Sequence, residues 1–148
     1  MADRFWACIE IGGRLRQADV PRFCKEARIN PCDLPEYLQE GRFVLENSEA
    51  AYGRFEDLED LCQELGLAYR RQSDGKYEFT PEIVAWRPGL EEPDCVLTDH
   101  MGDPVIALGS VRKIYDALKA GHQQEALALA VEALAEPAKP PPLEVVEA

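Results

Sequence analysis

An amphipathic segment at residues 55–66 limits the possible folds more than any other part of the chain. Its apolar side chains recur at steps of three and four, at Phe55, Leu58, Leu61, Cys62 and Leu65. This spacing predicts a helix with one apolar face, and Gly66 follows where a left-handed helix end belongs. The opposite face carries the acids Glu56, Asp57, Glu59, Asp60 and Glu64. We therefore expect a helix that packs by one side and presents a row of carboxylates on the other.

Strand-forming runs stand on both sides of this helix. Residues 5–11 are rich in aromatic and β-branched side chains, which predicts a first strand. A helix is predicted to begin at Asp19, and a short strand is predicted at residues 42–45. The resulting β-α-β-α-β-β order up to Arg87 favours an α+β fold, with a small antiparallel or mixed sheet and helices on one face. This order is close to a ferredoxin-like arrangement.

The last strands of that order are predicted to form a hairpin around residues 73–75. A three-residue loop ending in a left-handed glycine pairs Tyr69 with Phe79 and gathers the aromatic side chains on one face. It also sets Arg70 opposite Glu78, where the two charges attract. A two-residue loop would divide the aromatic side chains between the two faces, so the longer loop is preferred.

The C-terminal part contains a predicted helical hairpin. Short strands are predicted at residues 95–97 and 105–108, and Ser110 is the expected cap of a helix that follows. Residues 123–135 are rich in alanine and leucine and form a second helix in this prediction. The two helices are expected to pack as a hairpin.

The end of the chain is predicted to be disordered. Four prolines fall within residues 137–142, a composition typical of a disordered or polyproline segment. We therefore expect one α+β domain at residues 1–136, consisting of a sheet-and-helix core at 1–87 and an extension at 95–136, and a disordered tail at 137–148.

The chain is strongly acidic. It has 28 acidic and 16 basic residues, for a net charge of −12, which opposes direct binding to nucleic acid or to an anionic membrane. Residues 12–28 contain five bases and two acids, whereas residues 33–64 contain ten acids and two bases. This asymmetry predicts two faces of opposite potential.

The cysteines point to no disulfide framework or metal motif. Five occur at irregular spacing without a Cys-x-x-Cys pair, and Cys32 and Cys95 fall in predicted loops, where thiols are most reactive. No stretch approaches the ~20 apolar residues of a membrane span, and the first residues do not resemble a signal peptide. We expect reduced thiols and a cytoplasmic protein.

No motif for catalysis or for a cofactor is recognisable. Gly12-Gly13 after a strand lacks the third glycine of a dinucleotide fingerprint and the lysine of a phosphate loop, so a bulge or turn is expected there. One loop gathers Asp94, Asp99, His100 and Asp103, which are suitable metal ligands at a spacing that matches no known metal loop. A small enzyme or ligand-binding domain with its site at residues 91–103 is one alternative function.

The acidic helix supports the leading prediction, which is a non-enzymatic protein that binds a basic protein surface. Carboxylates at steps of three and four stand ~5–6 Å apart and imitate the phosphates of a nucleic-acid strand. A specific form is an inhibitor, encoded by a phage or mobile element, of a nucleic-acid-binding defence complex. The predicted partner-binding residues are Glu56, Asp57, Asp60, Glu64, Glu46 and Glu49. A second alternative is a housekeeping subunit that self-associates through its C-terminal helices.

Overall fold

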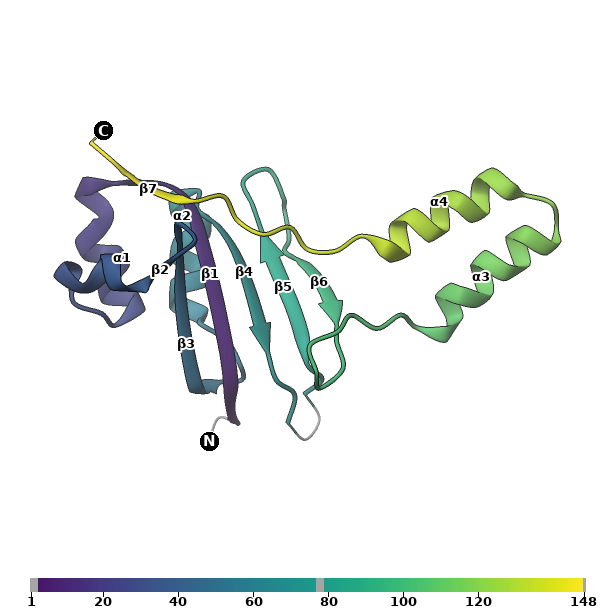
Figure 1. Cartoon of the computed structure of the whole chain (residues 1–148), viewed down its shortest axis with the longest axis horizontal. Helices are drawn as coiled ribbons and strands as arrows, with labels where there is room; N and C mark the ends of the chain where they lie inside the picture. The colour runs from purple at the N-terminus through teal and green to yellow at the C-terminus, as the bar shows by residue number, and fades with distance from the viewer. Residues whose placement is uncertain (1–2, 77–78, 148) are drawn as a thin grey trace.

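The strand predicted at residues 5–11 is the centre of the sheet. The computed structural model describes residues 3–76 and 79–147. Its strands are β1 (Arg4–Arg16), β2 (Leu38–Gln39), β3 (Arg42–Ala51), β4 (Ala68–Ser73), β5 (Glu82–Trp86), β6 (Asp94–Leu97) and β7 (Leu143–Val146). They follow the order β2-β3-β1-β4-β5-β6 with antiparallel neighbours throughout, and β7 pairs with β1 in parallel (Figure 1).

Helices connect these strands and complete an α+β domain, as predicted. The α-helices of the described residues are α1 (Val20–Ala27), α2 (Glu56–Leu65), α3 (Leu108–Lys119) and α4 (Gln123–Leu134), and the 3-10 helices are η1 (Gln17–Asp19) and η2 (Pro31–Tyr37). The helix predicted from residues 55–66 is α2, and Gly66 ends it with a φ of 72°. No helix in the described part of the chain is long and apolar enough to cross a membrane.

Alternation along β1 builds the core. Ala7, Ile9 and Ile11 are fully buried, while the side chains between them are only half-buried. The buried side chains pack against apolar stripes of α1 and α2, as the spacing in both helices predicts. Phe23 of α1 meets Phe43 of β3 edge to face, with ring centroids 5.0 Å apart. The core therefore fixes both helices on the same face of the sheet.

The element order differs from the predicted β-α-β-α-β-β order by one short strand, β2. Helix α2 joins β3 to β4, which run in the same direction on either side of β1 and so form a split β-α-β unit. Helix α1 leads through η2 from β1 to the two-residue strand β2, which pairs with the far edge of β3 and runs parallel to β1. The exact predicted order is not confirmed, because it omits β2 between α1 and β3 and because β6 and β7 extend the sheet further.

The predicted hairpin register is wrong. Tyr69 pairs with Trp86 and Arg70 pairs with Ala85, so β4 meets β5 and the connection runs from Asp74 to Pro81. Residues 77 and 78 lie outside the described residues, and with them the predicted partner of Arg70. The observed register places Tyr69 and Trp86 on the core side, with ring centroids 6.4 Å apart. The burial of Trp86 thus decides the register, although this register needs a longer loop than the predicted one.

The segment predicted to be a disordered tail is ordered up to residue 147. Pro137 and Pro140 are buried, and residues 143–146 form β7 beside β1. Prolines cannot donate a backbone hydrogen bond, but their carbonyls still accept one. Arg42 Nε donates to the carbonyl of Pro140 at 2.6 Å, and the amide of Gly13 donates to that of Pro142 at 3.1 Å. The tail therefore docks on the domain.

The glycine pair of β1 makes room for this tail. A Cβ on Gly12 would lie 1.5 Å from the carbonyl oxygen of Pro141, so no larger residue fits while the tail is docked. Gly13 has a φ of 120°, a conformation that favours glycine. The predicted bulge or turn at this pair is instead the point where β1 begins its pairing with β7.

The region after β6 contains one further difference from the prediction. Residues 105–108 form no strand, because Val105 only continues a local pairing with Leu97 and α3 already begins at Leu108. Ser110 accordingly lies inside α3, and Ala107 is the capping residue. Helices α3 and α4 run side by side and stand away from the sheet as an arm (Figure 1).

Candidate acidic binding surface

The carboxylate row of α2 borders a groove between α1 and α2. Leu58, Leu61 and Cys62 anchor α2 in the core, which turns Asp57, Asp60 and Glu64 outwards. The groove has a volume of about 320 Å³ and is lined by Arg22, Glu26, Asp57, Asp60, Leu61 and Glu64. Four carboxylates thus meet one guanidinium there. The groove carries a local charge of −3, because four negative charges oppose one positive charge.

Helix α1 contributes two of these groups. Arg22 donates from Nη1 and Nη2 to the two carboxylate oxygens of Glu64, at 3.2 and 2.6 Å. Both side chains are more than half exposed, so this pair contributes little to stability. Glu26 stands one turn further along α1 and is half-buried. Neither residue was predicted as part of the surface, because their contact with α2 depends on the tertiary packing of two helices.

The prediction of two faces with opposite charge is wrong in this region. Arg22 belongs to the basic segment and Glu64 to the acidic one, yet they form an ion pair. Arg16 of the basic segment is likewise neutralised by Asp19, at 2.8 Å. The bases of residues 12–28 are therefore partly paired, and one of them lines the acidic groove.

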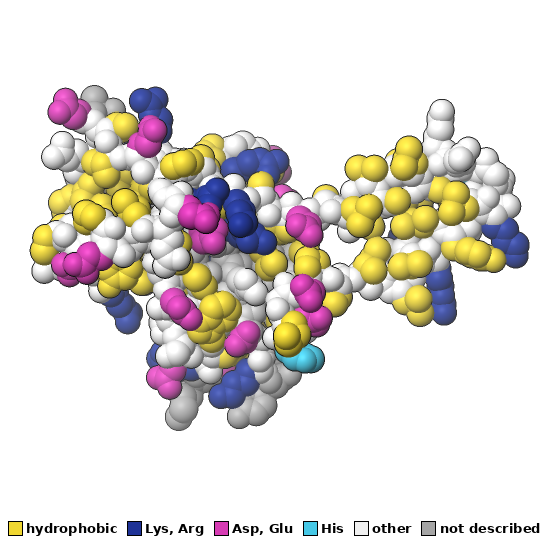
Figure 2. All heavy atoms as spheres, in the orientation of Figure 1, with side chains coloured by type: hydrophobic (Ala, Val, Ile, Leu, Met, Phe, Trp, Pro, Cys, Tyr) yellow, Lys and Arg dark blue, Asp and Glu magenta, His cyan; other side chains and the backbone are white. Residues whose placement is uncertain are grey.

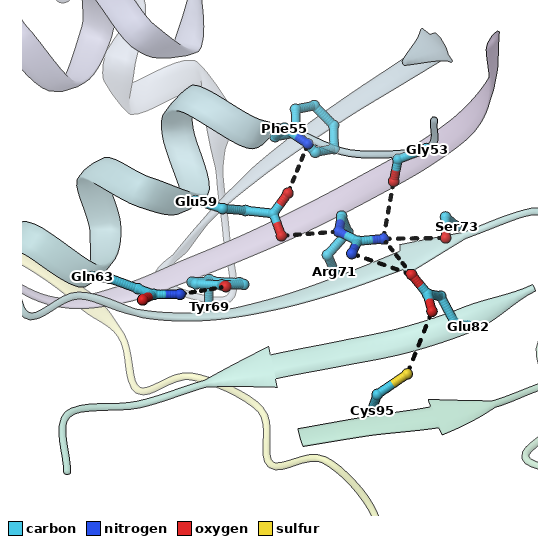
Figure 3. Close-up of polar contacts among 9 residues, drawn as sticks. All are labelled: Gly53, Phe55, Glu59, Gln63, Tyr69, Arg71, Ser73, Glu82 and Cys95. Atoms are coloured by element: carbon cyan, nitrogen blue, oxygen red, sulfur yellow. Dashed lines mark hydrogen bonds and ion pairs between the residues drawn. The ribbon is translucent and has the colours of Figure 1, made fainter. Parts of the chain in front are cut away.

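A buried ion-pair network holds the start of α2 in place (Figure 3). Glu59, expected on the polar face, is only 7% exposed and accepts a hydrogen bond from Arg71 Nε at 3.0 Å. Its second oxygen accepts from the backbone amide of Phe55 at 2.8 Å, which caps the helix. Arg71 also donates to the carbonyl of Gly53 at 3.0 Å and to Glu82 at 3.3 Å. Because every partner is satisfied, the network fixes α2 relative to the sheet.

Of the remaining predicted residues, Glu46 and Glu56 lie in a hollow beside the groove, and Glu49 lies away from it. A second cavity of about 700 Å³ adjoins the groove, and both Glu46 and Glu56 line it. Its walls also carry the bases Arg4, Arg28 and Arg54, so its charge is mixed. Glu46 in addition accepts a hydrogen bond from the indole of Trp6. Glu49 is exposed on β3 and lines neither hollow.

In the acidic loop at residues 91–103, which was predicted as an alternative site, the carboxylate of Asp99 stabilises the turn of the loop itself. Oδ1 of Asp99 accepts from the amides of Met101, at 2.9 Å, and Asp103, at 3.0 Å. Among the described residues no group of three or more His, Cys, Asp or Glu is arranged to hold a metal ion.

The cysteines are unpaired, and two of the more accessible thiols differ in environment. All five are free thiols. Cys95 donates to Glu82 at 3.4 Å, and the loss of solvent around the thiol together with the Glu82 carboxylate raises the pKa of Cys95 to about 11. This pKa keeps Cys95 protonated at neutral pH, unlike the reactive thiol predicted for that position. Cys32 is exposed and lies beside Asp33.

Comparison with known proteins identifies no relative of this chain. No protein-family model matches the chain, and neither the curated proteins nor the solved structures contain a match. The functional argument therefore depends on the site itself.

Proposed function

We propose that this protein is a non-enzymatic interaction protein that binds a basic protein surface through the groove between α1 and α2. The observation that supports this most is the convergence of Glu26, Asp57, Asp60 and Glu64 on one groove with a single base, Arg22. Asp57 and Asp60 have no ion-pair partner among the described residues. Their charges are therefore available to a lysine or arginine of a partner.

The rigidity of α2 supports the same proposal. Side chains on a helix anchored by buried apolar residues and by the Arg71 network need little reordering when they bind. The net charge of −12 adds a long-range attraction that speeds encounter with a basic surface. Affinity should then depend strongly on ionic strength.

A finer form of the proposal concerns the kind of basic surface. Asp57, Asp60 and Glu64 follow one another at steps of three and four along α2, ~5–6 Å apart. Such a row suits a groove that normally holds nucleic-acid phosphates, as in an inhibitor of a phage-defence complex. Arg22 neutralises the last member of the row, so Asp57 and Asp60 contribute most of the free charge. Competition between the protein and a nucleic acid for the partner tests this form.

Two charge-matched variants test the binding role of the groove. Asp57→Lys with Asp60→Lys and Glu91→Lys with Glu92→Lys each change the net charge by the same amount, from −12 to −8. The second pair lies in the exposed loop between β5 and β6 and does not line the groove. We expect tagged wild-type protein and the loop variant to capture the same partner from a host lysate, and the groove variant to lose it. Equal capture by both variants would refute the proposal.

A further inference from the structure

The arm formed by α3 and α4 buries very little of its apolar surface. Gly121 joins the two helices, and the amide of His122 donates to the carbonyl of Ala117 at 2.9 Å to close the turn. Within the arm only Ala117 and Ala126 are fully buried among the described residues. Small side chains are therefore the most buried part of the contact between the helices, Ile114 and Leu129 are half-buried beside them, and the other large apolar side chains are exposed.

The large side chains form one regular stripe on each helix. On α3 they stand at steps of three, four and three, and on α4 at steps of four and three. These residues are Leu108, Val111, Tyr115 and Leu118 on α3, and Leu127, Val131 and Leu134 on α4, with exposures from 42% to 78%. Figure 2 shows hydrophobic side chains over both helices on the visible face of the arm. This spacing is that of the a and d positions of a heptad, which pack into a facing helix.

The two helices carry opposite charges. Helix α3 has the bases Arg112, Lys113 and Lys119 and the acid Asp116, for a balance of +2. Helix α4 has the acids Glu125 and Glu132, for a balance of −2. No ion pair joins α3 to α4 in the described residues. The arm is therefore complementary to a second copy turned by a two-fold axis, which sets each α3 against the α4 of its partner.

The area of the stripe is sufficient for such a contact. Seven large side chains, each losing on the order of 80 Å² of exposed surface, remove about 560 Å² from water on each copy. Two copies together bury roughly 1,100 Å², which exceeds the ~1,000 Å² that a biological interface needs and lies just below the range of the most stable ones. The arm also stands clear of the sheet (Figure 1), so two arms can meet without contact between the sheets.

We propose that the arms of two copies pack face to face into an antiparallel four-helix bundle, with α3 of each copy against α4 of the other. Four-helix bundles with short loops commonly form from two such hairpins, because a single hairpin leaves one apolar face uncovered. This contact uses a surface separate from the acidic groove, so each copy of the dimer retains its own groove.

Sedimentation equilibrium of the full chain at ~5–100 µM tests the proposal. We expect the wild type to sediment at twice the 16.6 kDa mass of the chain. Tyr115→Glu with Val131→Glu places two carboxylates in the stripe and should raise the dissociation constant at least ~100-fold. Circular dichroism should show that this variant keeps its fold, because both side chains are exposed in a single copy.

A matched control adds the same charge outside the stripe. Gly109→Glu with Ala128→Glu also introduces two carboxylates on exposed positions of α3 and α4, and a Cβ on Gly109 meets only open space. This control should remain dimeric. A wild type that stays at 16.6 kDa up to ~100 µM overturns the proposal, and so does a control that dissociates as far as the stripe variant.

Charge reversal tests the relative placement of the helices. Reversing the α3 bases with Arg112→Glu, Lys113→Glu and Lys119→Glu should raise the dissociation constant at least ~10-fold, because acidic α3 then faces acidic α4. Adding Glu125→Lys and Glu132→Lys to the same chain should restore the dimer. Failure of this restoration excludes the α3-to-α4 arrangement.

Discussion

Docking of the C-terminal segment on β1 leads to a specific prediction for Gly12. Alanine suits the backbone of Gly12, which is not left-handed, but its Cβ would lie 1.5 Å from the carbonyl oxygen of Pro141. We therefore expect Gly12→Ala to release the tail without unfolding β1. The variant would then lose the same contacts as a chain that ends at Glu136.

The size of the effect follows from the contacts of the tail. Besides the ladder between β7 and β1, three hydrogen bonds join it to the domain: Arg42 to Pro140 O, Gly13 N to Pro142 O, and Leu143 N to Gly41 O. At ~1 kcal/mol each, the loss of these three alone lowers the free energy of unfolding by about 3 kcal/mol. For a chain of this length the melting temperature should fall by ~6–12 °C.

Thermal unfolding of four proteins measures this coupling. They are the wild type, Gly12→Ala, the truncation after Glu136, and the truncated Gly12→Ala. Because the substitution and the truncation remove the same contacts, the two effects should not add, and the double variant should melt like either single one. Gly109→Ala is the matched control, since its Cβ has open space, and it should melt no lower than the wild type. Additive losses, or a truncation that melts within ~2 °C of the wild type, would refute the docked tail.

Three further outcomes follow from the site. Glu59→Ala should lower the free energy of unfolding by ~3–5 kcal/mol in chemical denaturation, because it leaves the buried charge of Arg71 with fewer partners, whereas Glu64→Ala should cost under ~1 kcal/mol. Asp57→Lys with Asp60→Lys should melt at or slightly above the wild-type temperature, since it relieves repulsion along α2. Alkylation followed by mass spectrometry at pH 7.5 should label Cys32 well before Cys95, whose raised pKa of about 11 keeps the thiolate scarce until the pH nears that value.

Local patterns predicted the elements that depend on local spacing. The stripe of Leu58, Leu61 and Cys62 predicted α2, and Gly66 predicted its end, because both signals lie within a few residues of one another. The aromatic and β-branched side chains of residues 5–11 likewise predicted the first strand. These features depend only on the spacing or the composition of a short segment.

Contacts between distant residues were not predictable in the same way. Arg22 and Glu64 are 42 residues apart, and nothing in the spacing of either segment indicates that α1 and α2 are adjacent. The spacing of Glu59 along the helix does not distinguish it from its acidic neighbours, and only the structure shows that it contacts Arg71. Burial of a charged side chain depends on its partner, which comes from another element.

The tail and the hairpin show why local propensity was misleading. Four prolines predict disorder when considered alone, but Pro140 and Pro142 supply carbonyl acceptors to Arg42 and Gly13. A three-residue loop that gathers the aromatic side chains on one face favoured pairing Tyr69 with Phe79, yet the chain pairs Tyr69 with Trp86 and buries both. In each case the stabilising contact is made with another element of the fold, which a local pattern does not include.

Carbodiimide coupling tests the binding surface most directly, because it joins a carboxylate to a lysine amine only where the two are in contact. The protein would be coupled to its captured partner, and mass spectrometry would identify the linked residues. We predict links from Asp57, Asp60 or Glu26 of the groove to lysines of the partner, reduced as salt is raised. Links confined to exposed acids elsewhere, such as Glu91, Glu92 or Glu144, with the groove carboxylates unlinked, would contradict the account.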